Sequence, residues 1–154
     1  MQLSTLLKST LRQALNHTGP LPLYIDYAKW LQAGKPVPTP HLVKQRAIRE
    51  FARRYGLTTL VETGTYQGAM VEAMRPHFKK IISIELSVDL AAQAQKRFAA
   101  DPSVRILQGD SGKVIEEVLP TLKQPTLFWL DGHYSGGFTA KADLETPLTE
   151  EMLR

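Results

Sequence analysis

The chain contains no cysteine among its 154 residues. Disulfide bonds, a thiolate nucleophile and a cysteine-ligated zinc site are therefore excluded. The sequence also lacks any apolar run near the ~18 residues that a membrane-spanning helix requires, so no membrane partner is expected. Polar side chains interrupt the apolar residues at the start of the chain, unlike a secretory signal peptide. We therefore expect a cytoplasmic protein with one main domain, since domains comprise about 150 residues.

Acidic residues are scarce in the first third of the chain. Residues 1–56 contain nine lysines and arginines but only two acidic residues, whereas the whole chain carries a net charge of +4. A basic segment attracts anionic partners such as nucleic acid, an acidic metabolite or a membrane surface, but it is also commonly a solvated helix face. Charge alone leaves these interpretations open.

This N-terminal segment is expected to be helical. Apolar residues recur at helical spacing over residues 2–16, and a second, short helix is predicted over residues 24–32. A third helix is predicted to begin after Thr39 as its N-cap, with Pro40 in the first turn, and to end at Gly56.

After Gly56 the pattern changes to short apolar runs that alternate with amphipathic helices. Strands are predicted over residues 58–62, 81–85, 104–110 and 126–131. Helices are predicted within residues 70–78, 90–98 and 114–119, with Ser111 as the cap of the last one. The alternation is typical of a doubly wound, mainly parallel α/β sheet, which we assign to residues 57–154.

An acidic residue stands on or near the carboxyl end of each predicted strand: Glu62, Glu85, Asp110 and Asp131. Each acid alone has an ordinary explanation as a turn or cap residue. In a parallel sheet, however, all four would meet at the edge where ligands bind. The pattern indicates a negative rim that suits a ligand with cationic and hydroxyl groups.

The first strand is followed by a turn that contains two glycines. Gly64 allows the chain to turn tightly, and Gly68 allows the following helix to pack closely on the sheet. Glu85 lies 21 residues after Gly64, where a carboxylate can accept both hydroxyl protons of an adenosine ribose. These features are shared by dinucleotide-binding folds.

Glu62 and Tyr66 favour a different ligand. A pyrophosphate needs bare backbone N–H groups at the helix start, and a carboxylate beside it would repel the anion. Glu62 instead suits a ligand with an ammonium and a sulfonium, and Tyr66 stands where a pyrophosphate site would have its middle glycine. S-adenosylmethionine therefore fits this turn better than NAD, and an NAD oxidoreductase is the least favoured alternative.

These residues together resemble the motifs of class I S-adenosylmethionine-dependent methyltransferases, which have a Rossmann-like fold. Glu62-x-Gly64-x-x-x-Gly68, Ile84-Glu85, Gly109-Asp110-Ser111 and Leu130-Asp131 resemble motifs I to IV. Motif I is similar to that of small-molecule O-methyltransferases of the catechol and caffeoyl-CoA type. The phrases Val-Glu-Thr-Gly-Thr-Tyr, Ser-Ile-Glu-Leu-Ser and Phe-Trp-Leu-Asp-Gly-His-Tyr-Ser-Gly-Gly look like a little-characterised bacterial branch of that superfamily. The resemblance covers residues 57 to about 150.

The resemblance implies a role for each matching residue. Glu62 would lie near the ammonium of the cofactor and Glu85 would hold its ribose. Asp110 and Ser111 would face the adenine, and Asp131 would lie near the methyl group. Cofactor contacts are implied for Glu62, Gly64, Thr65, Tyr66, Gly68, Glu85, Leu86, Asp110, Ser111 and Asp131.

Methyl transfer to oxygen also needs a group that removes the acceptor's proton. His133 follows Asp131 closely and is the candidate base, although a single loop histidine is as commonly structural. Asp131 could also bind Mg²⁺, which takes about six oxygen ligands. The families of this type draw the partner ligands from a later strand, so the ligand set here is incomplete. Asp143 or Glu145 could substitute.

We therefore expect an S-adenosylmethionine-dependent methyltransferase that acts on oxygen of a small molecule or sugar. One alternative is a non-catalytic, cofactor-binding remnant or interaction module, since few residues follow the fourth strand. Another is an RNA methyltransferase, which the basic segment suggests. Motif IV reads Leu-Asp-Gly-His and lacks the Asn/Asp-Pro-Pro-aromatic pattern used on exocyclic base nitrogens, so a nucleic acid partner is not expected.

The fourth predicted strand, Thr126-Leu-Phe-Trp-Leu130, has the continuous apolar character of a central strand. The family resemblance implies the order 3-2-1-4-5-7-6, of which this chain would contain 3-2-1-4. The sheet would then be incomplete, with an apolar edge exposed. We expect further strands of a longer polypeptide, or a second copy in a homo-oligomer, to cover this edge.

Overall fold

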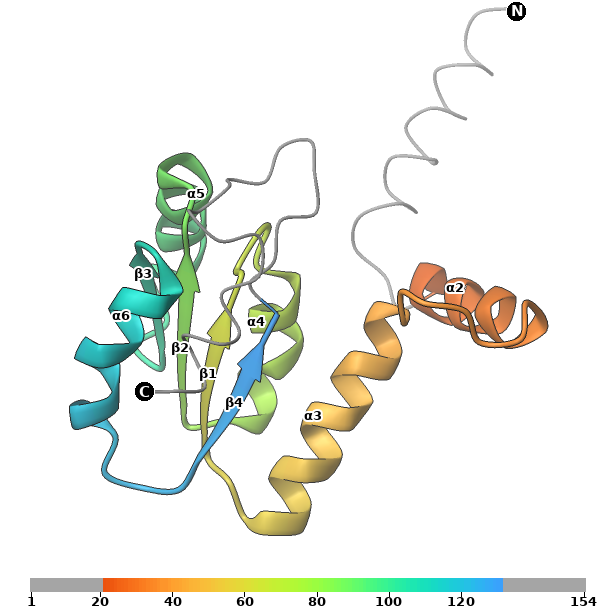
Figure 1. Ribbon diagram of the computed structural model, residues 1–154, viewed down its shortest axis with the longest axis horizontal. Coiled ribbons are helices and arrows are strands. Elements are labelled where there is room, and N and C mark those ends of the chain that lie inside the picture. Colours follow the sequence, from red (N-terminus) through yellow and green to blue (C-terminus); the bar gives the residue numbers. More distant parts are fainter. Residues whose placement is uncertain (1–20, 132–154) are drawn as a thin grey trace, which may run out of the picture. The chain divides into compact units, whose positions relative to one another are not determined.

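A computed structural model describes residues 21–131 of the chain (Figure 1). Contacts divide the chain into two compact units, Met1–Ala47 and Ile48–Arg154. The helix predicted over residues 2–16 lies outside the described part. Within that part, no helix is both long enough and apolar enough to cross a bilayer.

The first unit contains helix α2, Leu21–Gln32, and the start of helix α3, His41–Tyr55. Helix α3 occurs where the sequence predicts it, and α2 begins three residues before the predicted start at residue 24. Pro22 lies in the first turn of α2, where its missing N–H has no consequence for the hydrogen-bond ladder. In the last turn of α2, the indole N–H of Trp30 donates to the carbonyl of Pro36 at 2.7 Å and closes the loop that follows the helix.

The second unit is built on a parallel sheet of four strands in the order β3-β2-β1-β4. The strands are β1 (Thr59–Thr63), β2 (Lys80–Glu85), β3 (Val104–Gln108) and β4 (Thr126–Leu130). This confirms the predicted strands and their order. In the register, Thr63 lies opposite both Ile84 and Leu130, so the carboxyl ends of β2, β1 and β4 meet at one edge.

Helices α4 (Ala69–Met74), α5 (Val88–Phe98) and α6 (Ser111–Val118) connect the strands. Short 3₁₀ turns, η1 (Arg75–His77) and η2 (Leu119–Thr121), extend α4 and α6. The predicted helix within 70–78 is thus shorter than expected, because Pro76 cannot donate the next helical hydrogen bond and its ring crowds the preceding turn.

The cap of α6 differs from the prediction. Asp110, not Ser111, is the N-cap residue, and its carboxylate accepts from the backbone N–H of Gly112 at 3.0 Å. Ser111 is the first residue of the helix and is buried. Both residue types cap well, so the sequence does not distinguish them by type.

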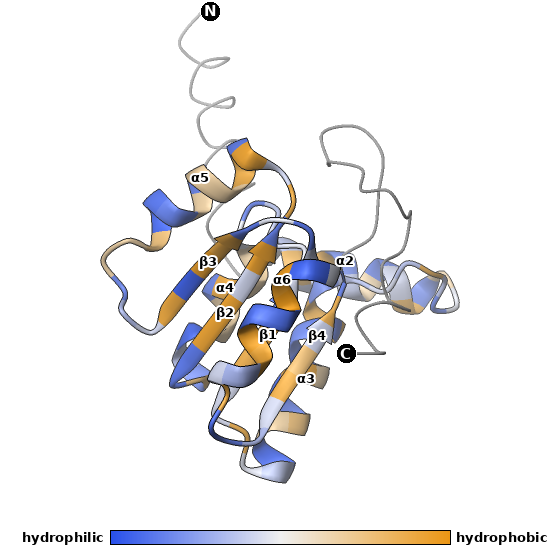
Figure 2. Ribbon diagram, turned by 60° about the vertical axis from the view of Figure 1, so that its left-hand side comes forward, coloured by the Kyte–Doolittle hydropathy of each residue, from blue (hydrophilic) through white to orange (hydrophobic). Residues whose placement is uncertain are grey.

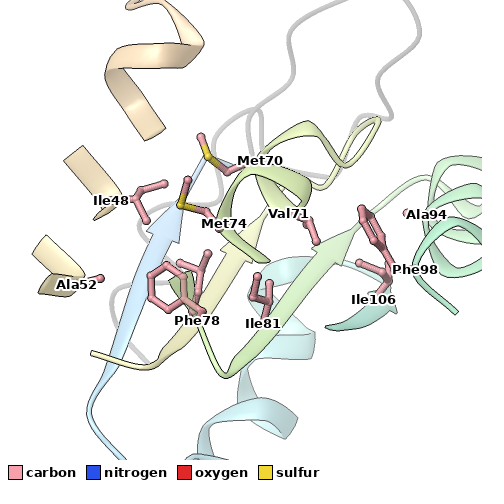
Figure 3. Packing of buried hydrophobic residues seen from close by; sticks show 11 residues of the cluster. Ile48, Ala52, Met70, Val71, Met74, Phe78, Ile81, Ala94, Phe98 and Ile106 are labelled. Carbon is pink, nitrogen blue, oxygen red and sulfur yellow. The ribbon is translucent and has the colours of Figure 1, made fainter. Parts of the chain in front are cut away.

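Successive side chains of a strand point to opposite faces of the sheet, and the apolar ones form a separate cluster on each face. Figure 3 shows the larger cluster, in which Ile81 and Ile106 of the strands pack with residues of α3, α4 and α5, among them Ile48, Met74 and Phe98. The smaller cluster joins Val61 and Ile82 to Val118 of α6. Figure 2 shows the hydrophobic residues along the strands. Helices therefore cover both faces, which confirms a doubly wound, Rossmann-like sheet.

Strand β4 is less covered than β1. Every residue of β1 is buried, whereas no residue of β4 is fully buried and Phe128 is 37% exposed. Among the residues that the structure describes, β4 pairs only with β1. The apolar edge expected from the sequence is present in this part of the chain. Its cover by further strands or by a second copy stays a prediction.

Candidate functional site

The turn between β1 and α4 carries the left-handed backbone that its glycines suggest. Gly64 has φ 84°, and its N–H donates to the carbonyl of Ile84 at 2.9 Å. The N–H of Thr65 donates to the same carbonyl at 3.3 Å, so the turn is tied to the end of β2. Tyr66 also has a positive φ, 49°, which is uncommon for a bulky residue, and its side chain is 46% exposed. This strained, exposed aromatic residue marks the turn as a functional candidate.

Gly68 has φ 76° and is the N-cap residue of α4. A Cβ atom at this position would lie 2.7 Å from Cε2 of Phe98, so the glycine allows α5 to approach the turn. The sequence predicts close packing at Gly68 against the sheet. The structure shows that its nearest neighbour is instead an aromatic ring of a second helix.

Arg97 of α5 fixes the same turn from outside. Its guanidinium lies 5.1 Å from the centre of the Phe98 ring and donates to the carbonyl of Gln67 at 2.7 Å. It also pairs with Glu72, which pairs in turn with Arg75. No motif in the sequence indicates Arg97, because its partner is a backbone carbonyl that lies 30 residues earlier.

Asp101 ends this surface network, where Arg75 donates to its carboxylate at 2.7 Å. The hydroxyl and the backbone N–H of Ser103 also donate to it, at 2.6 and 2.9 Å. These hydrogen bonds, those from Ser103 first, hold the pKa of Asp101 below its ordinary value. The hydrogen bond to Asp101 raises the pKa of Arg75 in return. The network joins charged side chains of α4, η1 and α5 to Asp101, and it contacts the turn through Arg97.

Glu85 is the last residue of β2, and the structure places it against the turn. Its Oε2 accepts from the backbone N–H of Tyr66 at 2.7 Å, and its Oε1 accepts from that of Ser87 at 3.0 Å. The side chain is only 6% exposed. Each carboxylate oxygen has a further lone pair after these bonds, so Glu85 can still accept two hydroxyl protons. The sequence brings Glu85 to the strand end but does not indicate that it also holds the turn.

Glu62 is more deeply placed than the expected rim. It is the fourth residue of β1, lies opposite Ser83 of β2, and is 3% exposed. The hydroxyl of Ser83 donates to its Oε2 at 2.7 Å. Thr65, in the turn, lies 2.6 Å from the same hydroxyl. Ser83 is therefore a site neighbour that the motif analysis missed, although a serine within Ile-Ile-Ser-Ile signals a buried polar group that needs a partner.

The remaining predicted residues lie after the ends of β2, β3 and β4 or beyond the described part. Asp110 and Ser111 begin α6, and the backbone N–H of Gly109 donates to the carbonyl of Glu85 at 2.9 Å. Leu86 follows β2 directly, and its carbonyl accepts from the side chain of Gln108 at 2.9 Å. Asp131 directly follows β4 and is half-buried. These residues and the turn share the carboxyl edge of the sheet.

The predicted base and the substitute metal ligands lie outside residues 21–131. They are His133, Asp143 and Glu145. Within the described residues, no group of three or more His, Asp or Glu side chains could hold a metal ion. A magnesium site therefore has no support from this part of the chain.

The described residues put two buried carboxylates beside one glycine-containing turn. Glu85 accepts from two backbone amides, and Glu62 accepts from the Ser83 hydroxyl, which in turn contacts the Thr65 hydroxyl. A carboxylate that retains free lone pairs can accept from ligand hydroxyls, and a second one favours a cationic group. The site is thus suited to a ligand that presents a diol and an ammonium, and is unsuited to a pyrophosphate.

No family model matches the chain. Ribosomal RNA small subunit methyltransferase A of Acidobacterium capsulatum is 32% identical to it over 80 residues. This match covers 52% of the chain and 27% of that protein, so the chain spans about a quarter of its curated relative. The relative is a methyltransferase, the class that the motifs resemble.

Two solved structures are similar to part of this chain. The O-methyltransferase from Bacillus cereus in complex with SAH is 12% identical, with a TM-score of 0.49, over 73% of this chain and 55% of that one. The SAM-bound amino pentose methyltransferase from Micromonospora echinaspora is 23% identical, with a TM-score of 0.40, over 58% of this chain and 36% of that one.

Proposed function

We propose that this chain is the cofactor-binding part of an S-adenosylmethionine-dependent methyltransferase. The observation that carries the proposal is the position of Glu85. It ends the strand beside β1, and its carboxylate receives the Tyr66 N–H of the glycine-containing turn at 2.7 Å. A carboxylate in this position accepts the hydroxyl protons of an adenosine ribose in doubly wound folds.

The donor set fits this cofactor. Glu85 would hold the ribose with the lone pairs that its backbone partners leave. The turn, with Gly64, Thr65, Tyr66 and Gly68, would line the methionine part, and Glu62 would balance the ammonium. Asp110, Ser111 and Leu86 would surround the adenine. NAD fits less well, because the buried Glu62 disfavours a pyrophosphate beside the same turn.

The bound cofactor supplies a methyl group on an already reactive sulfonium. The chain's own residues would orient the acceptor and manage its proton. We propose that His133 holds the acceptor proton as a general base, and that Asp131 at the end of β4 lies close to the transferred group. Methyl transfer to oxygen of a small molecule or sugar is the reaction that best suits these residues, because motif IV lacks the pattern used on base nitrogens.

RNA is the second candidate acceptor, and the named curated relative favours it. Helix α3 also supports it, since it carries Arg53 and Arg54 beside exposed, stacked rings of Phe51 and Tyr55. Basic and aromatic side chains together bind single-stranded nucleic acid, with an affinity that falls steeply with salt. Retention of a single-stranded oligoribonucleotide at about 0.2 M salt by the wild type, and its loss in Arg53→Glu/Arg54→Glu, would favour this candidate.

Calorimetric titration of the chain with S-adenosylmethionine tests the proposal directly. We expect saturable binding by the wild type and a weaker affinity for Glu85→Gln, with Asp89→Asn on the surface of α5 as the matched control. Transfer of a labelled methyl group to pools of hydroxylated small molecules and of RNA then separates the two acceptors. Binding without transfer to any acceptor would favour a non-catalytic cofactor-binding module. Absence of binding would contradict the proposal.

A further inference from the structure

Three buried polar side chains form a hydrogen-bonded chain across β1, β2 and the turn. Thr65 Oγ1 lies 2.6 Å from Ser83 Oγ, and Ser83 Oγ lies 2.7 Å from Glu62 Oε2. Glu62 and Thr65 are each 3% exposed, and Ser83 is fully buried. A buried hydroxyl needs a partner, so these short contacts fix the conformations of all three side chains.

The chemistry of the groups sets the direction of the hydrogen bonds. An ionised carboxylate only accepts, and each hydroxyl has one proton to give. Ser83 therefore donates to Glu62 and can only accept from Thr65, which donates to it. Both hydroxyl dipoles then point toward the carboxylate. Aligned hydrogen bonds of this kind strengthen one another in a buried setting.

The two hydrogen bonds link the turn, through Thr65 and Ser83, to the Glu62 carboxylate. Thr65 stands next to Gly64 in the turn, while Ser83 is the register partner of Glu62 on the neighbouring strand. Loss of the Ser83 hydroxyl would remove a hydrogen bond from Glu62 without removing its charge, and loss of the Thr65 hydroxyl would remove the partner that orients Ser83. The separate contact of Glu85 with Tyr66 would remain.

We infer that Thr65 and Ser83 are positioning residues, which hold the Glu62 carboxylate in the orientation that receives a cationic group of the ligand. The inference rests on the proposed function, because that cation is the ammonium of the cofactor's methionine part. On this inference, Thr65 and Ser83 determine how strongly the site prefers ligands that carry the ammonium over ligands that lack it. The ribose contact is left to Glu85.

Two unreactive ligands separate these contributions. S-adenosylhomocysteine carries the amino acid part, whereas 5′-methylthioadenosine has the same adenosine and a thioether but lacks it. For Ser83→Ala, we expect the affinity for S-adenosylhomocysteine to fall about tenfold or more and that for 5′-methylthioadenosine to stay within about twofold, since a hydrogen bond to a charged group is lost. Titration calorimetry measures both.

Thr65 offers a second pair of variants should Ser83→Ala fail to fold. Thr65→Val removes the hydroxyl at nearly constant shape and should selectively weaken the affinity for S-adenosylhomocysteine. Thr65→Ser retains the hydroxyl and should bind S-adenosylhomocysteine with an affinity close to that of the wild type. Thr59→Val, a buried threonine at the other end of β1, is the matched control and should change neither affinity.

The outcomes distinguish this inference from the proposed function. Selective loss of S-adenosylhomocysteine binding in Ser83→Ala or Thr65→Val, with rescue in Thr65→Ser, supports it. Equal loss of both ligands, or no loss, overturns it while the proposed function stands on wild-type binding. If the wild type binds neither ligand, both the proposed function and the inference that rests on it fail.

Discussion

Strands β1 and β4 are neighbours in the same sheet, yet the described residues bury β1 far more completely than β4. β1 is buried throughout, and the turn after it is fixed by hydrogen bonds to Glu85 and Ser83, which accept, and by one from Arg97, which donates. β4 is partly exposed, and Asp131 at its end is the last residue described. The half of the site that we propose for cofactor binding is therefore built into the core of the fold. The half that we propose for chemistry depends on residues at the margin of the described structure.

The proposed role of His133 gives the largest expected effect and tests the division of labour between the two strands. A general base contributes about 10²- to 10⁴-fold to rate. For His133→Ala, we expect turnover to fall by that factor while affinity for S-adenosylmethionine stays unchanged. Turnover kinetics and calorimetry measure the two quantities, and His77, exposed in η1, provides the control variant His77→Ala. Unchanged turnover would remove His133 from the mechanism.

Truncation of a side chain on each strand tests the difference in burial. Leu60→Ala empties a fully buried position on β1 and should lower the free energy of unfolding by about 2–5 kcal/mol. Phe128→Ala on β4 should lower it by about 1 kcal/mol or less, because its side chain is partly exposed. Chemical denaturation gives both values. Equal losses would show that residues outside the described range cover the β4 edge.

Gly68→Ala should distort the turn itself. The left-handed backbone opposes a side chain by roughly 1–2 kcal/mol, and overlap with Phe98 adds about 1–3 kcal/mol. Gly56→Ala is the matched control, since Gly56 has a similar φ of 62° but nothing within 4 Å of its Cβ position. The double variant Gly68→Ala/Phe98→Leu should recover part of the loss. If Gly68→Ala and Gly56→Ala lose equal stability in chemical denaturation, the proximity of Phe98 to Gly68 does not contribute to the loss.

Glu85→Gln tests both roles of this carboxylate. We expect the affinity for S-adenosylmethionine to fall about 10- to 100-fold, because charge-assisted hydrogen bonds to the ribose weaken. The sequence suggests a rim residue whose replacement leaves stability unchanged. The structure instead predicts a loss of about 1–3 kcal/mol, since the amide nitrogen of Gln cannot accept a hydrogen bond and one of the two backbone N–H groups would lose its partner. Thermal melting beside calorimetry measures both effects, and unchanged affinity would contradict the ribose assignment.

The smallest effect concerns pH and the network outside the turn. The pKa of Asp101 is lowered in the folded state, so the unfolded chain binds its proton more readily. The stabilisation from Asp101 is therefore present above the ordinary carboxyl pKa of about 3.9 and is lost as the pH falls toward the lower folded value. Asp101→Asn should remove that part of the acid dependence of the melting temperature. A melting profile below pH 5 that matches the wild type would refute this.

The sequence predicts the sheet well because the fold depends on long, repeated patterns. The strands follow from short apolar runs that alternate with amphipathic helices along the chain. The same alternation places Glu85 and Asp110 at the carboxyl ends of strands. Contacts between distant residues are harder to predict. Arg97 donates to the backbone carbonyl of Gln67, and Ser83 of β2 donates to Glu62 on the neighbouring strand β1. Neither contact leaves a pattern in the local sequence. Glu62 was expected at the rim, but its burial follows from a register that only the paired strands define.

The hydrogen bond between Tyr66 and Glu85 provides a natural spectroscopic reporter. An amide that donates to a carboxylate at 2.7 Å should give a downfield, well-resolved proton signal in an NMR spectrum of the chain. A ligand whose hydroxyls share that carboxylate would change the electron density that this proton experiences, while a ligand bound elsewhere would not. One backbone resonance could thus identify ligands for the β2 end of the sheet in a mixture of small molecules, without an enzymatic assay.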